Sequence, residues 1–213
     1  PEDIIGWISE PSMEKTDYLM KNPNINLILA TGGPAMVKSA YSSGKPAIGV
    51  GAGNTPALID KSANLKMAVA SILMSKTFDN GVVCASEQTI IAHKDVYSEV
   101  KKLLKEEGAH FLTKDEMSKL SPIILDPKRG TVNPKIVGQN AYTIAQIAGF
   151  EVPKNTKVLI GEVKDIAVDE PFAHEKLSPV LGMYSCDNFG EGAAMAAKLI
   201  AMGGFGHTSV LYC

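Results

Sequence analysis

Cysteine is scarce in this chain of 213 residues. The three cysteines, Cys84, Cys186 and Cys213, are odd in number and far apart in the sequence. A disulfide framework needs paired cysteines, and a zinc site needs closely spaced ligands. We therefore expect no disulfide framework and no metal site, and we expect the protein to be cytoplasmic, where thiols stay reduced.

Long apolar runs and an excess of one charge are also missing. No apolar run approaches the ~18 residues that a membrane-spanning helix needs, and no signal peptide is recognisable. The net charge is −2, and both signs are scattered along the chain. We therefore expect neither a membrane nor a nucleic acid as partner. Because the chain opens at Pro1 and stops at Cys213 at the end of an apparent strand, we expect a piece of a longer protein.

Two common nucleotide-binding signatures, GxGxxG and the P-loop, are absent as well. The first sixty residues nevertheless alternate between short apolar strands and helices, which is typical of a parallel sheet with right-handed crossovers. Ligands of such sheets bind beyond the carboxyl ends of the strands, where Thr31-Gly32-Gly33 and Gly51-Ala52-Gly53 stand. Glycines there let the backbone approach a phosphate or a flat ring, although ordinary turn chemistry remains an alternative. The expected strands are 4–8, 26–30, 46–50 and 57–59, and the expected helices are 13–21 and 34–41.

A second α/β unit is expected after residue 62, so that the domains are 1–62 and 63–213. Its helices are recognised by apolar stripes at helical spacing and by Thr113 and Glu116, which match a capping box. A surface turn is expected at 126–130. The expected helices are 65–75, 94–107, a short one after Thr113, 140–148 and 189–201. The expected strands are 88–92, 109–112, 157–161, 163–168, 180–185 and 209–212.

The stretch from Lys76 to Gln88 stands out because it places one cysteine, Cys84, in a loop between a helix and a strand. Functional residues concentrate in such loops. We interpret Cys84 as a nucleophile. The alternative, a cysteine that acts only as a small buried apolar residue, is common and remains open.

Five stretches resemble the aldehyde dehydrogenase superfamily, and most closely the CoA-acylating module of the bifunctional aldehyde-alcohol dehydrogenases. Together they represent a resemblance over essentially the whole chain. They are ILATGGP (28–34), YSSGKPAIGVGAGNTP (41–56), SKTFDNGVVCASEQ (75–88), EPFAHEKLSP (170–179) and MGGFGHTS (202–209). The resemblance implies an aldehyde dehydrogenase-like α/β fold, in which the end of a Rossmann-like cofactor domain is followed by an α/β catalytic domain with a parallel sheet.

The resemblance also implies site residues. Cys84 takes the place of the catalytic cysteine, and His207 lies in a turn near the active site of the acylating branch. Glu175 stands where the superfamily hydrogen-bonds the cofactor's ribose. Gly33 and Gly51, together with Thr31 and Gly32, fall where the backbone approaches the nicotinamide cofactor.

Other readings of these residues stay open. His207 is equally well explained as a hydrogen-bonded turn residue, and His174 as a structural residue that steers the loop of Glu175. His93 and His110 are interpreted as ordinary strand-end or surface residues, and Cys186 and Cys213 as inert.

One departure from the hydrolytic aldehyde dehydrogenases is informative. Those enzymes carry a general-base glutamate at the position of Val50 in this chain. Without that base the activation of water is slow, whereas a thiol ionises far more readily. The substitution therefore favours coenzyme A as acyl acceptor, unless Glu87 or another carboxylate takes over.

The resemblance thus predicts an NAD-dependent acylating dehydrogenase that interconverts acetaldehyde or another short aldehyde with acyl-CoA. The alternatives are a hydrolytic enzyme that releases a free acid and a module that acts mainly in filament assembly. A homo-oligomer or filament is expected for the full-length protein, and iron only if an alcohol dehydrogenase domain follows. The choice between NAD and NADP stays open, and this piece alone is expected to bind cofactor poorly.

Overall fold

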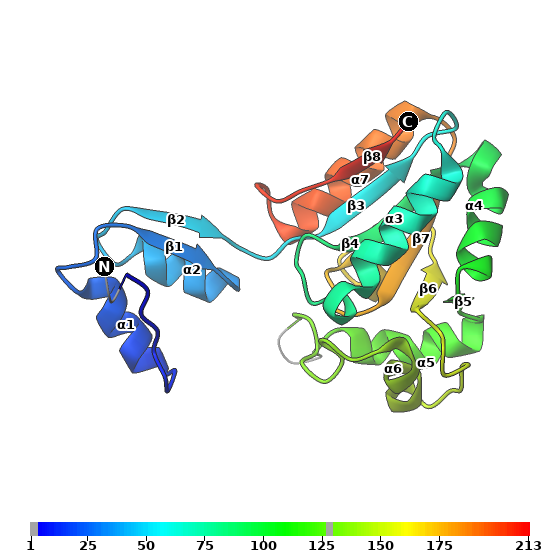
Figure 1. Ribbon diagram of the computed structural model, residues 1–213. Coiled ribbons are helices and arrows are strands. Elements are labelled where there is room, and N and C mark those ends of the chain that lie inside the picture. Colours follow the sequence, from blue (N-terminus) through cyan, green and yellow to red (C-terminus); the bar gives the residue numbers. More distant parts are fainter. Residues whose placement is uncertain (1–3, 127–129) are drawn as a thin grey trace. The chain divides into compact units, whose positions relative to one another are not determined.

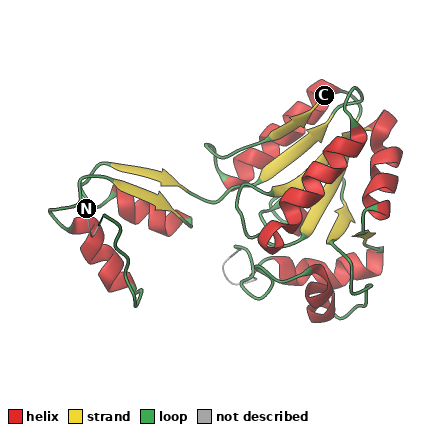
Figure 2. Cartoon of the chain, in the orientation of Figure 1, coloured by secondary structure: helices red, strands yellow, loops and turns green. Residues whose placement is uncertain are grey.

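The computed structural model describes residues 4–126 and 130–213. The chain divides into two compact units, residues 1–52 and 53–213, each of which is described by itself (Figure 1, Figure 2). The expected boundary at residues 62 and 63 lies ten residues further on. The division comes earlier because strand β3 (Thr55–Ile59) pairs with two strands of the second unit.

The first unit is a small α/β layer. Helix α1 (Met13–Lys21) begins after Ser12, whose hydroxyl caps it, and helix α2 (Pro34–Tyr41) begins with a proline in its first turn. Strands β1 (Ile28–Thr31) and β2 (Ala47–Val50) are parallel, with Thr31 opposite Val50. Buried apolar side chains from α1, β1 and α2 form its core: Met20, Ile28, Ala30 and Ala40.

The strand expected at 4–8 is not formed, because these residues are exposed and pair with no strand in the described part of the chain. A run of apolar residues alone does not make a strand, which also needs a hydrogen-bonding neighbour. Ile4, Ile5 and Trp7 remain open to solvent. The helices expected at 13–21 and 34–41 are confirmed.

The second unit is built on a six-stranded sheet in the order β5-β6-β7-β4-β3-β8, in which every paired strand is parallel. The expected parallel sheet is therefore confirmed. Its other strands are β4 (Glu87–His93), β5 (Ala109–Phe111), β6 (Val158–Glu162), β7 (Val180–Cys186) and β8 (Val210–Tyr212).

Helices cover both faces of this sheet (Figure 1). Alternate residues of β3 point to opposite faces: Ile59 packs with the helices α3 and α4, whereas Leu58 packs with Leu199 of α7. A third cluster joins α5 and α6. The bounds are α3 (Leu65–Thr77), α4 (Lys94–Glu106), α5 (Lys114–Ile124), α6 (Ala141–Ala148) and α7 (Phe189–Gly203).

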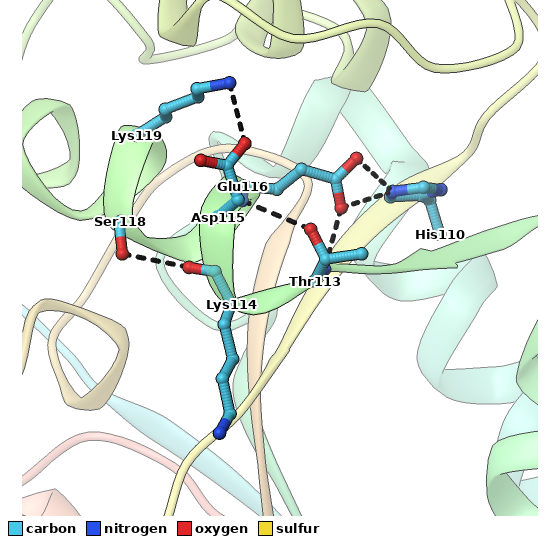
Figure 3. Close-up of polar contacts among 7 residues, drawn as sticks. All are labelled: His110, Thr113, Lys114, Asp115, Glu116, Ser118 and Lys119. Carbon is cyan, nitrogen blue, oxygen red and sulfur yellow. Dashed lines mark hydrogen bonds and ion pairs between the residues drawn. The ribbon is translucent and has the colours of Figure 1, made fainter.

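The start of α5 confirms the expected capping box (Figure 3). The N–H of Glu116 donates to Thr113 Oγ1 at 3.3 Å, and the N–H of Thr113 donates to Glu116 Oε2 at 2.7 Å. His110 Nε2 lies 3.1 Å from the same carboxylate. Burial opposes the ionisation of Glu116, but these hydrogen bonds outweigh it and lower the pKa of the carboxyl group.

Two other expectations fail in this unit. Residues 163–168 form no strand, because the chain makes one ladder-like bond, from Val163 N to Met183 O, and then leaves the sheet. The helix expected to be short after Thr113 extends over 11 residues as α5 and continues two residues past Pro122. The turn expected at 126–130 includes residues 127–129, which lie outside the described residues.

Within the described ranges, no helix is long and apolar enough to cross a membrane. Over the same residues, no group of three or more His, Cys, Asp or Glu side chains is arranged to hold a metal ion.

Candidate active site

The loop that carries Cys84 begins with a sharp reversal of the chain. After α3, the residues Asp79, Asn80 and Gly81 have φ angles of 47°, 50° and 73°. Left-handed backbone is strained in residues with a side chain. At Gly81 there is also no room for a side chain, since a Cβ would lie 2.9 Å from the backbone of Ser178. The reversal therefore packs the start of the Cys84 loop directly on the chain that precedes β7.

Cys84 follows in a turn closed by a hydrogen bond of 2.9 Å from Ser86 N to Val83 O. Its side chain is half-buried, so the thiol is accessible without being fully exposed. The hydroxyl of Thr55 lies 3.5 Å from the carbonyl oxygen of Cys84 and connects this loop to the start of β3.

Glu175 lies in the loop between the short 3-10 helix η2 (Pro171–Ala173) and β7. Its Oε1 accepts a hydrogen bond of 3.1 Å from the N–H of Gly53. Burial raises the pKa of this carboxyl group, although the Gly53 N–H and the ammonium groups of Lys76 and Lys176 act in the opposite direction. Its other oxygen, Oε2, has no hydrogen-bond partner among the described residues and can bind a ligand hydroxyl.

His207 is placed by Gly53 as well. A Cβ on Gly53 would lie 2.7 Å from Cγ of the imidazole ring, so the ring packs directly on the glycine backbone. Nδ1 of His207 accepts the N–H of Thr208 at 3.0 Å. In the neutral ring the proton is then on Nε2, which makes that atom a donor.

The segment 53–55 thus contacts three of the expected site residues: Glu175, His207 and, through Thr55, Cys84. All of these residues precede a strand of the parallel sheet, so the candidate site lies at the amino ends of β3, β4, β7 and β8. The usual rule for open α/β sheets places ligands at the opposite ends, and it does not apply to this unit.

The remaining expected residues gather in the first unit. The N–H of Gly32 donates to Val50 O at 3.1 Å, which places Thr31, Gly32 and Gly33 beside the end of β2 that leads to Gly51. A Cβ added at Gly33 or Gly51 would meet nothing within 4 Å. The Cβ positions of these two glycines are therefore open, which is compatible with the expected approach of a ligand to the backbone.

Sequence reasoning missed a buried polar cluster behind the Cys84 loop. Lys76, Gln88 and Lys176 are completely buried. Lys76 Nζ and the backbone N–H of Lys176 donate to Gln88 Oε1 at 3.1 and 2.9 Å. Burial lowers the pKa of Lys76 to about 7, against the opposing effect of Glu87 and Glu175, and it lowers the pKa of Lys176 well below its ordinary value.

A sequence signal for Lys76 existed. The apolar stripe of α3 continues at helical spacing from Ile72 and Leu73 to position 76, where a lysine stands. A charged residue on the buried face of a helix indicates a buried polar partner.

The other histidines and cysteines make local contacts. His93 Nδ1 accepts the N–H of Asp95 and caps α4, and His174 Nε2 lies 2.7 Å from Val168 O. Cys186 is buried, which raises the pKa of its thiol, whereas Cys213 is exposed.

Comparison with known proteins identifies the family of this chain. The family model of the aldehyde dehydrogenase family matches residues 1–196. The aldehyde-alcohol dehydrogenase of Clostridium acetobutylicum is 60% identical over 212 residues, which cover 100% of this chain and 24% of that protein. The chain thus spans about a quarter of the length of this curated relative.

Solved structures show the same fold. An acetylating aldehyde dehydrogenase from Geobacillus thermoglucosidasius has a TM-score of 0.95 and 44% identity, covering 100% of this chain and 47% of that one. A propionaldehyde dehydrogenase from Rhodopseudomonas palustris, with bound CoA and an acylated cysteine, has a TM-score of 0.85 and 30% identity, covering 95% of this chain and 45% of that one. The expected fold and the resemblance to aldehyde-alcohol dehydrogenases are therefore confirmed, and the chain belongs to the aldehyde dehydrogenase family.

Proposed function

We propose that this chain carries the catalytic cysteine and part of the cofactor site of a CoA-acylating aldehyde dehydrogenase, which interconverts acetaldehyde or another short aldehyde with its acyl-CoA. The observation that supports this most directly is the segment 53–55. It holds Glu175, His207 and the Cys84 loop around one short stretch of backbone. A nucleophile, a hydrogen-bond donor and a carboxylate are thereby gathered at one end of the sheet.

In the proposed reaction the thiolate of Cys84 attacks the aldehyde carbon and forms a thiohemiacetal. The negative oxygen that develops needs fixed donors, and we assign this role to backbone N–H groups of the Cys84 loop and to His207 Nε2. When hydride leaves that carbon with its two electrons, the C=O bond forms again and a thioester remains on Cys84. The thiolate of coenzyme A then adds to the thioester, and the Cys84 thiolate leaves.

Coenzyme A is the proposed acyl acceptor because Val50 stands where a water-activating glutamate is expected in hydrolytic relatives. Valine can neither accept nor donate a proton, so hydrolysis of the thioester lacks a base at that position. The Rhodopseudomonas palustris relative, solved with CoA and an acylated cysteine, supports the same route.

The proposed cofactor is NAD, which accepts the hydride when bound. Thr31, Gly32, Gly33 and Gly51 are proposed to present backbone to it, since neither Gly33 nor Gly51 has an atom near its Cβ position. Glu175 is proposed to bind a ribose hydroxyl with Oε2, because Oε1 is already held by Gly53.

The test uses the intact natural polypeptide that contains this sequence. NADH formation from acetaldehyde and NAD is measured with and without coenzyme A, for the wild type, for Cys84→Ser and for Cys213→Ser as matched control. We expect NADH only when coenzyme A is present, a loss of ~10³-fold or more in Cys84→Ser, and no change in Cys213→Ser. Equal rates without coenzyme A would mean hydrolysis, and full activity in Cys84→Ser would exclude Cys84 as nucleophile.

Three further points belong to the proposal. The protein is proposed to be cytoplasmic. It is also proposed to form a homo-oligomer, and gel filtration of the intact polypeptide tests this assembly. A broad and very large species would indicate a filament instead. Iron is proposed only for an alcohol dehydrogenase domain elsewhere in the polypeptide, and metal analysis tests that point.

A further inference from the structure

The buried side chain of Gln88 connects the two loops that the proposed function assigns to different tasks. Gln88 is the second residue of β4 and is completely buried. Its Oε1 accepts hydrogen bonds from Lys76 Nζ and from the backbone N–H of Lys176, and its Nε2 donates to Ser86 O at 3.2 Å. Lys176 follows Glu175 directly, and Ser86 closes the turn that holds Cys84.

The orientation of this amide is determined by its partners. The backbone N–H of Lys176 can only donate, and the carbonyl of Ser86 can only accept. A rotated amide would therefore face a donor with its NH₂ group and a carbonyl with its own oxygen. Because Gln88 is completely buried, each mismatch would leave a polar group unpaired, which is costly.

A second contact joins the same two loops. The backbone of Gly81, at the start of the Cys84 loop, packs on the backbone of Ser178, three residues after Glu175. Gly138 N donates to Leu177 O at 3.0 Å and holds the same loop from its other side. The two loops are therefore in contact at both ends of the Cys84 segment, and Gln88 is the side chain that joins them by hydrogen bonds.

We propose that Gln88 is a positioning residue that couples cofactor binding at Glu175 to the placement and reactivity of Cys84. This inference rests on the proposed function. A ligand held by Glu175 orders the loop that continues into Lys176. The hydrogen bond from the Gln88 amide to Ser86 O extends this ordering to the turn that holds Cys84. Gln88 itself touches neither the cofactor nor the substrate.

The variant Gln88→Glu distinguishes the hydrogen bonds that Gln88 accepts from the one that it donates. A carboxylate can still accept from Lys76 and from Lys176 N, but it cannot donate to the carbonyl of Ser86. Gln146→Glu is the matched control, since Gln146 is exposed and, among the described residues, its side-chain amide donates only to Tyr142 Oη. The intact natural polypeptide is used, and the rate at which iodoacetamide alkylates Cys84 is measured with and without saturating NAD.

In the wild type and in Gln146→Glu we expect NAD to change the alkylation rate. In Gln88→Glu we expect this NAD effect to disappear and kcat to fall by about 10–100-fold, while KM for NAD stays within about 3-fold, because Glu175 is untouched. A role limited to stability would lower the melting temperature without abolishing the NAD effect. That result, or an NAD effect that is absent in the wild type, would overturn the inference.

Should Gln88→Glu fail to fold, the double variant Lys76→Met, Gln88→Met gives the same readout. It removes the ammonium group of Lys76 together with the amide oxygen that accepts from it, so that neither of these two groups is left without the other. A retained NAD effect in this variant would also overturn the inference. Failure of the proposed function is recognised separately, because the wild type would then form no NADH with coenzyme A, whatever the alkylation rates show.

Discussion

The imidazole ring of His207 lies directly on the backbone of Gly53, so that a Cβ at Gly53 would come within 2.7 Å of the ring carbon Cγ. The two residues are 154 positions apart in the sequence. Since Gly53 N also donates to Glu175, this glycine sets the positions of two candidate site residues at once.

The first prediction concerns this contact. Gly53→Ala must displace the ring of His207, because Cβ atoms do not approach other atoms so closely. We expect kcat for CoA-dependent NADH formation to fall by about 10–100-fold. Gly6→Ala is the matched control, since a Cβ at Gly6 meets nothing within 4 Å. Unchanged kcat in Gly53→Ala would show that the position of His207 is unimportant for the reaction.

A second prediction concerns Glu175. Glu175→Gln removes the charge that is proposed to bind the ribose, and we expect KM for NAD to rise by about 10–100-fold. Glu151→Gln, on the exposed surface, is the control. Because burial raises the pKa of Glu175, the wild type loses this charge at a higher pH than an ordinary glutamate does. KM for NAD in the wild type should therefore increase as the pH falls toward that pKa, whereas KM in Glu175→Gln should not. Parallel pH profiles for both proteins would contradict the assignment.

Lys76 provides a prediction about stability. Burial lowers its pKa from 10.5 to about 7, and Glu87 and Glu175 oppose this shift while Lys176 adds to the local positive charge. Between these two pKa values the unfolded chain binds more protons than the folded chain. Stability therefore rises with pH over this range and is lowest below about pH 7.

The stability of the wild type is compared with that of Lys76→Met, which has no titrating group at position 76. The free energy of unfolding of the wild type relative to that variant should increase by about 2–3 kcal/mol from pH 6 to pH 9, as measured by urea titration. Lys66→Met, on the exposed side of the same helix, should show no such trend. A difference that is independent of pH would mean that Lys76 keeps its ordinary pKa.

The capping box of α5 can be tested in the same way (Figure 3). Thr113→Ala removes the acceptor for Glu116 N and should destabilise the protein by about 1 kcal/mol. Ser118→Ala, in the same helix, also removes a hydroxyl, but one that bonds within an exposed turn, and it should be nearly neutral. Because the pKa of Glu116 is lowered from the reference value of 4.5, its contribution to stability is present above that value and is lost as the pH falls through the folded value. If the thermal melts of Thr113→Ala and Ser118→Ala coincide, the capping box does not contribute the expected stability.

Sequence reasoning predicted the local structure well where short-range signals agree. Thr113 and Glu116 mark the start of a helix because a capping box acts over only four residues. Sequence reasoning failed at residues 4–8 and 163–168, where apolar residues suggested strands. Whether such a run becomes a strand depends on a partner strand that is distant in the sequence.

Dependence on residues that are distant in the sequence also explains which parts of the candidate site could be predicted. The motif around Cys84 was recognisable because its residues are contiguous. The contacts of Gly53 with Glu175 and His207, and those of Gln88 with Lys76 and Lys176, join segments up to 154 residues apart, and no local pattern contains them.

By itself the sequence determined the family, the alternation of helices and strands, and the identity of the candidate nucleophile, because each is expressed in contiguous residues. Only the tertiary structure decided that β3 belongs to the second unit and that the site residues meet at the amino ends of its strands. It alone also revealed the buried amide behind the Cys84 loop. Strand pairing and the burial of polar groups are decided by residues that meet only when the chain has folded.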